Sequence, residues 1–315
     1  TWFDRTNYYA TLPSDRIDLA LDIESDRMRN SLLDEKDRND EMTVVRNEFE
    51  RGENSPSQAL NKLIWSTAYM AHPYHTNTIG WKSDIEKVPM TKLREFYNTF
   101  YWPNNATLTI IGDFKTYEIL AKIDRYFGNI SKSPHTIPIV YTEEPKQEGA
   151  KRVILKRSGP NNLVIIAHKT PPALHIDNYA LAILSEILSN GKTSRFYRGL
   201  IDKNLATDAN VYHYGLYDNA LISSIIEFPI EKNHQEIEQH VLDIYKDVKT
   251  NGIKEDEIKR AKKQIIASLA FDRDGSYSIA SGINEAIASG DWKYYVNFEK
   301  NIQNVTSKMV QKVAQ

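Results

Sequence analysis

The sequence predicts an α+β fold made of two similar halves. In each half the helices are segregated from the strands, which favours a mostly antiparallel sheet with helices packed on one face. A length of 315 residues favours two domains over one. Residues 131–149 contain three prolines and no periodic apolar pattern, which is typical of a linker. We therefore expect domains at residues 1–130 and 150–315.

In the first half, residues 3–11 alternate and are rich in Tyr and Thr, and residues 105–112 form an apolar run. Both patterns are typical of strands. Ser14 or Asp15 can cap a helix that continues to about Met28. Further helices are expected at residues 34–54, 57–70, 91–101 and 117–127.

The second half repeats this mixture of strands and helices, as a divergent copy of the first would. Strands are expected at residues 152–156, 162–168, 206–214 and 220–227. Helices are expected at residues 176–188, 194–201, 233–250 and 253–271, with short helices over residues 276–315.

The helix at residues 34–54 is the most informative segment, because two of its carboxylates point toward its few apolar side chains. Glu41 and Glu48 are seven residues apart, so they project within about 20° of each other and about two turns apart. Their direction lies between Val44 and Val45, inside the apolar sector. A carboxylate removed from water costs several kcal/mol unless a cation or a metal meets it. The pair therefore predicts a site.

A less specific interpretation of these two glutamates stays open. Charged helices usually have a solvated face, and Arg38 or Arg46 could form ion pairs with the acids. On the helical pattern alone, a metal or catalytic role is the less common outcome.

Composition excludes several classes of function. The chain has no cysteine, so disulfides, thiolate zinc sites and cysteine nucleophiles are excluded. A net charge of −2 gives no reason to expect nucleic acid as a partner, and no apolar run reaches membrane-spanning length. A phosphate-binding loop is also excluded, because Glu186 stands where its first glycine is required.

The eight histidines do not form a metal-binding pair by spacing. His72 and His75 are separated by Pro73, which argues against a regular helix, and His234 and His240 would face different directions on one. Packing or surface roles are the more common interpretation for each.

The chain starts at Thr1 inside a predicted strand and stops at Gln315 inside a predicted helix, so we expect a fragment cut at both ends.

A series of short motifs runs along the chain: Thr1 to Tyr9, Leu19 to Ile23, the glutamate helix, His72-Pro73-Tyr74, Thr78-Ile79-Gly80, Tyr101 to Thr107, Gly112-Asp113-Phe114 and Ser194 to Tyr197. Together these motifs resemble the M16 (pitrilysin/insulinase-like) zinc peptidases, closest to the bacterial and mitochondrial processing-peptidase branch. The resemblance covers essentially the whole chain. It implies two tandem metallohydrolase modules of the LuxS/MPP-like kind: a truncated N-terminal catalytic-type module at residues 1–130 and a truncated C-terminal module at residues 150–315.

The resemblance also implies a role for each glutamate. Glu48 corresponds to the third zinc ligand, and Glu41 to a glutamate that supports the zinc site and is usually not a ligand. In the family the two histidine ligands and the general base belong to an upstream H-x-x-E-H motif, which is absent from residues 1–315. The implied function is that of a zinc-dependent metalloendopeptidase subunit that cleaves peptides or unfolded polypeptides inside a two-module chamber. The fragment alone would be inactive.

The resemblance further implies a partner subunit. In the family an Arg and a Tyr from the C-terminal-type module face the zinc, but Ile201 and Thr207 stand at those positions here. We therefore expect a heterodimer with a zinc-less, Arg/Tyr-bearing subunit.

Two alternatives to the peptidase function are a non-catalytic scaffold, as the core subunits of some respiratory complexes are, and a peptide-binding subunit. A periplasmic or cell-envelope location is expected from bacterial relatives.

Overall fold

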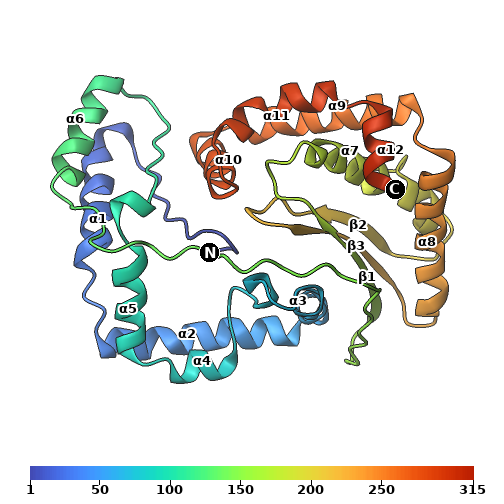
Figure 1. Ribbon diagram of the computed structural model, residues 1–315, viewed down its shortest axis with the longest axis horizontal. Coiled ribbons are helices and arrows are strands. Elements are labelled where there is room, and N and C mark those ends of the chain that lie inside the picture. Colours follow the sequence, from blue (N-terminus) through green and yellow to red (C-terminus); the bar gives the residue numbers. More distant parts are fainter. The chain divides into compact units, whose positions relative to one another are not determined.

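The computed structural model describes residues 1–315 and confirms the α+β class, with many helices and one small antiparallel sheet (Figure 1). The chain forms two compact units. The first unit comprises residues 6–150 and Thr1, and the second comprises residues 151–315 and the short segment Trp2–Arg5. That these units are a catalytic-type and a C-terminal module stays a prediction. None of the helices combines the length and hydrophobicity that a bilayer crossing requires.

The first unit consists of helices and loops. Its α-helices are α1 (Ile17–Asn30), α2 (Glu35–Asn54), α3 (Pro56–Ala68), α4 (Lys82–Lys87), α5 (Met90–Phe100) and α6 (Thr116–Phe127). Single 3₁₀ turns occur at η1 (Ser14–Arg16), η2 (Pro73–His75) and η3 (Pro103–Asn105). Side-chain caps explain two of the helix starts: Asp34 accepts the Asp37 N–H, and Ser55 accepts the Gln58 N–H.

The two strands expected in the first unit do not form. Within residues 3–11 only Arg5 takes part in a bridge, an isolated one to Trp2, and residues 105–112 contribute no strand. A strand needs the N–H and C=O groups of a neighbouring strand, and neither segment finds such a neighbour among residues 1–315. The prediction of a sheet in each half is therefore wrong for the first unit.

A cluster of aromatic rings forms much of the buried part of the first unit. Trp65 and Tyr69 are each 2% exposed, and their rings stack with centroids 5.6 Å apart. Tyr74 packs edge-on against both rings, at 6.1 and 5.7 Å. This cluster holds the C-terminal end of α3 against η2.

The second unit contains the sheet, in the strand order β1-β3-β2. The central strand β3 (Ala220–Pro229) pairs antiparallel with β1 (Asn161–Thr170) and with β2 (Asp208–His213). In this register, Thr170 lies opposite Ala220 and Asp208 lies opposite Glu227. The strand expected at residues 152–156 does not form.

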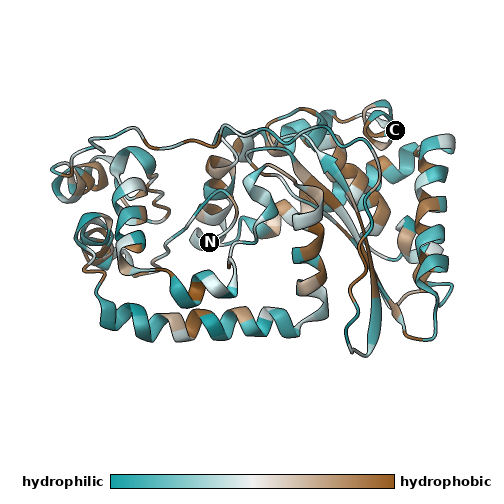
Figure 2. Cartoon of the chain, turned by 60° about the horizontal axis from the view of Figure 1, so that its bottom comes forward, coloured by the Kyte–Doolittle hydropathy of each residue, from teal (hydrophilic) through white to brown (hydrophobic).

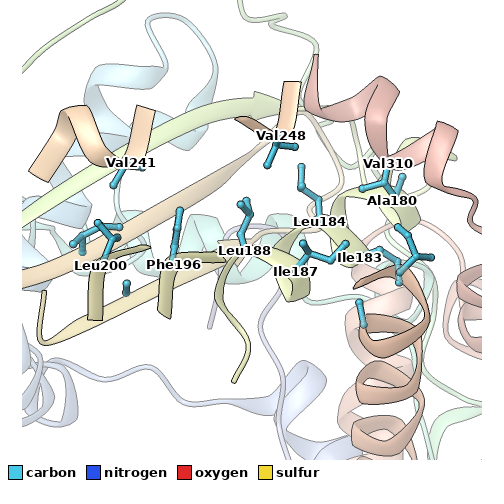
Figure 3. Close-up of a cluster of buried hydrophobic side chains, with 14 of the residues drawn as sticks. Ala180, Ile183, Leu184, Ile187, Leu188, Phe196, Leu200, Val241, Val248 and Val310 are labelled. Carbon is cyan, nitrogen blue, oxygen red and sulfur yellow. The ribbon is translucent and has the colours of Figure 1, made fainter. Parts of the chain in front are cut away.

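Helices cover one face of this sheet and enclose the main core (Figure 1). They are α7 (Asp177–Ser189), the π-helical turn η4 (Tyr197–Ile201), α8 (His234–Asn251), α9 (Glu255–Asp272), α11 (Lys293–Asn304) and α12 (Ser307–Ala314). The helix α10 (Ser276–Ala288) packs against α11 and contributes no residue to this core. The central helix α7 contributes Ile183 and Leu188, which pack beside Phe196 and Val248 (Figure 3).

Candidate functional site

The helix α2, which carries the two predicted site residues, is anchored along one side. Its Phe49 is buried, and the Lys62 ammonium lies 4.8 Å from the centre of the Phe49 ring and 4.9 Å from that of Trp81. The same ammonium donates to Glu53 Oε1 at 2.9 Å. These contacts fix the rotation of α2 about its axis and thereby decide which of its side chains face outward.

The basic residues of α2 do not pair with the two glutamates. Arg38 donates instead to the carbonyl oxygen of Val88 at 2.7 Å and to Asn39 Oδ1 at 2.8 Å. Glu41 and Glu48 have no hydrogen bond and no ion pair in the structure. The alternative in which Arg38 neutralises these acids is therefore wrong for this structure.

The prediction that these carboxylates lie in a buried apolar sector is also wrong. Both glutamate side chains are exposed, and Val44 beside them is 57% exposed. Figure 2 shows α2, the long helix of the first unit, as mostly hydrophilic with a few apolar positions. Burial is confined to Phe49, on the anchored side.

The acids elsewhere on the C-terminal half of α2 behave differently. Glu50 lies 3.5 Å from Lys82 Nζ, and Glu53 lies 2.9 Å from Lys62 Nζ. Glu48 precedes these paired residues in sequence and forms no ion pair with either lysine. It is an exposed carboxylate without a partner, as the interpretation of a solvated helix face expects.

Residues 1–315 do not hold a zinc ion on their own. A zinc site of a hydrolase needs three protein ligands, and no group of three or more His, Asp or Glu side chains is close enough to bind one ion. Glu41 and Glu48 are also about 10 Å apart along the helix axis, which favours one ligand and one supporting residue over two ligands. The donor set therefore fits a part of a zinc centre and not a whole one.

The histidine motif of the first unit has a packing role. His72 is 5% exposed, its Nδ1 accepts the Tyr74 N–H at 3.2 Å, and the two rings lie 4.3 Å apart. His75 Nδ1 lies 3.1 Å from the His72 carbonyl oxygen. These contacts agree with the packing role expected for the pair.

The second unit contains one histidine that is held neutral. His213 Nε2 lies 2.7 Å from the Oδ1 atom of Asn178, which is fully buried. Burial lowers the pKa of His213 to about 4, because the protonated ring would lose its hydration. The neutral ring then donates from Nε2, and the contact joins β2 to α7.

One polar contact in the first unit was not predicted from the sequence. The Glu144 carboxylate accepts the backbone N–H groups of Met70 and Ala71 at 2.9 Å and that of His72 at 3.1 Å. It ties the expected linker at residues 131–149 to the end of α3. No local signal could have revealed it, because the partners are more than 70 residues apart.

Ile201 and Thr207 lie where the resemblance leads one to expect an arginine and a tyrosine. Ile201 packs against the core of the second unit. The N–H and hydroxyl of Thr207 both donate to the Glu227 carbonyl oxygen, at 2.8 and 3.1 Å. Neither position offers a cation or a phenol to a substrate.

The sequence matches two descriptions of one family. Residues 87–265 match the family described as "Peptidase M16 inactive domain", and residues 1–81 match "Insulinase (Peptidase family M16)". The first match alone covers more than half of the chain. The chain belongs to the peptidase M16 family. The boundary between the two matches does not coincide with the division between the compact units at residue 150.

A protein named as a zinc protease and one named as a processing-peptidase subunit are similar to this M16 chain over most of its length. It is 25% identical, over 318 residues, to the zinc protease PqqE of Helicobacter pylori, in an alignment that covers 100% of the chain and 72% of that protein. It is 22% identical to the mitochondrial-processing peptidase subunit beta of Saccharomyces cerevisiae, over 91% of the chain and 65% of that subunit.

A solved structure shares the fold of this M16 chain. The crystal structure of a protease from Helicobacter pylori superimposes with a TM-score of 0.91 and 24% sequence identity. The match covers 96% of the chain and 74% of that protein. The arrangement of helices and strands described above is thus shared with that protease.

Proposed function

We propose that this chain supplies the glutamate side of the zinc centre of an M16 metalloendopeptidase, with Glu48 as a zinc ligand and Glu41 as a residue that supports the site. Family membership and the zinc-protease names of its relatives support this reaction class. The substrate class would be peptides or unfolded polypeptides.

The observation that carries the proposal is the free carboxylate of Glu48. The anchoring side of α2 is occupied by Phe49 and Lys62, and the acids near it are paired with lysines. Glu48 is exposed and has no partner. A carboxylate held in this way can bind a cation without first breaking an ion pair.

The remaining zinc ligands and the general base would come from an H-x-x-E-H motif on residues outside 1–315. Zinc in such a centre polarises the scissile carbonyl and activates water. The residues of this chain would hold and orient the metal-binding carboxylate, and the chain by itself would not hydrolyse peptides.

We further propose that the active form is a heterodimer. One similar protein is named as the beta subunit of a processing peptidase, which indicates an assembly of unlike subunits for that protein. In this chain Ile201 and Thr207 provide neither the cation nor the phenol that would stabilise an oxyanion. A zinc-less partner subunit would provide the cation and the phenol. The proposed location is the periplasm or cell envelope.

The zinc content of the natural protein that contains these residues tests the ligand assignment. We expect about one zinc per chain in the wild type and a loss of tenfold or more in zinc affinity for Glu48→Gln. Glu41→Gln should weaken zinc binding less, and Glu50→Gln is the matched control because Glu50 already pairs with Lys82. Full zinc retention in Glu48→Gln would contradict the assignment.

One observation favours a second candidate function. The longer family match is described as an inactive domain, and residues 1–315 contain no complete metal cluster. A non-catalytic scaffold or peptide-binding subunit of the same fold would bind no zinc in the wild type. The wild-type measurement therefore separates the two functions before any variant is made.

A further inference from the structure

The irregular segment at residues 133–146, here called the strap, is attached to the first unit at two points. The first is Ser133, whose N–H donates to Asn104 Oδ1 at 2.8 Å. The second is Glu144, whose carboxylate accepts the N–H groups of residues 70–72. No step of the proposed peptidase function uses this strap.

Little holds the strap between these two points. Residues 136–143 take part in no hydrogen bond and no ion pair in the structure. Three successive apolar side chains, Ile139, Val140 and Tyr141, are 80%, 55% and 88% exposed, so packing holds them only weakly. The far end of the strap thus depends on Glu144.

The contact at Glu144 joins one carboxylate to three successive backbone N–H groups. The Met70 N–H lies 2.9 Å from both carboxylate oxygens, and those of Ala71 and His72 lie 2.9 and 3.1 Å from Oε2. Successive N–H groups that converge in this way bind anions. Hydrogen bonds to an ionised acceptor are about twice as strong as those between neutral groups. The negative charge of Glu144 therefore accounts for much of the attachment.

The turn at residues 70–72 has contacts of its own that do not involve the strap. On one side of it the Tyr69 N–H donates to the Trp65 carbonyl oxygen at 3.2 Å, and on the other the Tyr74 N–H donates to His72 Nδ1 at 3.2 Å. Met70 is exposed, as is the residue after it, so water can reach their N–H groups once Glu144 has left. The turn can therefore keep its shape without the strap.

We propose that Glu144 is a releasable latch, and that the strap detaches from residues 70–72 as one piece when this carboxylate is lost. The latched and released states differ mainly in the hydrogen bonds to Glu144, because residues 136–143 make none. Segments held by few contacts are those that open locally while the rest of a domain stays folded. In the released state residues 136–146 would be a free chain.

Hydrogen exchange of single amides in the natural protein reads the latch at its own donors. The amides of residues 70–72 should be protected in the wild type. Glu144→Gln should make them exchange about tenfold faster, because glutamine offers one neutral acceptor in place of a charged pair of oxygens. Glu143→Gln is the matched control, because Glu143 is exposed and has no partner. The Tyr69 amide should exchange at the same rate in all three proteins.

Brief trypsin digestion of the same three proteins reads the strap itself. Proteases cut chain segments that are locally free, so cleavage after Lys146 should be about tenfold faster in Glu144→Gln than in the wild type or in Glu143→Gln. Cleavage after Lys132, next to the attachment at Ser133, should be equal in all three.

Several results would overturn the proposal. Unprotected amides at residues 70–72 in the wild type would do so without any variant, as would equal rates in Glu144→Gln and Glu143→Gln. Equal acceleration at Tyr69 would show that the whole end of α3 depends on Glu144, which contradicts release of the strap alone. If Glu144→Gln does not fold, as judged by circular dichroism, the shorter Glu144→Asp replaces it and should accelerate the same amides less. Glu48→Gln should behave as the wild type, so the test is independent of the zinc assignment.

Discussion

The two compact units share one predicted order of elements but differ in what they form. In the second unit the predicted strands at residues 162–168, 206–214 and 220–227 pair into a sheet, and a continuous core fills its helix-covered face. In the first unit the helices form, but residues 105–112 remain outside any strand. A helix satisfies its backbone within one segment, whereas a strand depends on another segment. The difference between the units follows from this dependence.

Amide hydrogen exchange on residues 1–315 should show this contrast most strongly. Amides of β3, which pairs on both sides, should exchange slower than those of residues 105–112 by about three orders of magnitude or more. Mass spectrometry of exchanged peptides measures both segments in one experiment. Equal protection would mean that residues 105–112 do pair, and the comparison between the units would fail.

A core truncation in the second unit should have the largest effect on stability. Phe228 is 0% exposed, so Phe228→Ala should lower the free energy of unfolding by about 3–5 kcal/mol. Phe271, which is 80% exposed, is the matched control, and Phe271→Ala should change it by less than about 0.5 kcal/mol. Urea unfolding followed by circular dichroism measures both. Similar losses for the two variants would show that the core is not where the structure places it.

The partly buried His213 should make the second unit sensitive to mild acid. Its pKa is lowered from 6.5 to about 4, so only the unfolded chain takes up a proton as the pH falls between these values. The stability it contributes is complete above pH 6.5 and is lost as the pH falls toward 4. We expect a loss of about 2 kcal/mol between pH 7 and pH 5.

His213→Gln is the variant that isolates this effect. Glutamine can still donate to Asn178 but does not titrate, so stability should vary less between pH 7 and pH 5. Urea unfolding at each pH, for the wild type and the variant, gives the difference. An unchanged pH dependence in the variant would show that another group is responsible.

The smallest effect on stability is expected at the candidate site in the first unit. Glu48→Gln should change the free energy of unfolding of residues 1–315 by less than about 0.5 kcal/mol, because Glu48 is exposed and unpaired. Glu53→Gln, which removes the negative charge that pairs with Lys62, is the comparison and should cost more. A large destabilisation by Glu48→Gln in thermal melts would indicate a structural role for this carboxylate.

Local signals predicted the helices well. The helix expected at residues 34–54 is observed as α2 at Glu35–Asn54, because Asp34 caps its start and the loop before Pro56 ends it. Strand patterns were less reliable. Residues 105–112 and 152–156 have the composition of strands, but composition does not say whether a partner strand is present.

The candidate site was predicted only in part. Helical geometry correctly places Glu41 and Glu48 on one side of α2, but it did not show that this side is exposed. Contacts that join distant segments were beyond sequence reasoning. The Glu144 carboxylate on the N–H groups of residues 70–72 depends on the tertiary fold.

A crystal structure of the zinc-loaded natural protein tests the central claim most directly. The account predicts that a Glu48 oxygen binds the zinc at about 2.0–2.2 Å and that Glu41 contacts a ligand or its surroundings without binding the metal. A zinc ion held by a different carboxylate, with Glu48 still in solvent, would contradict it.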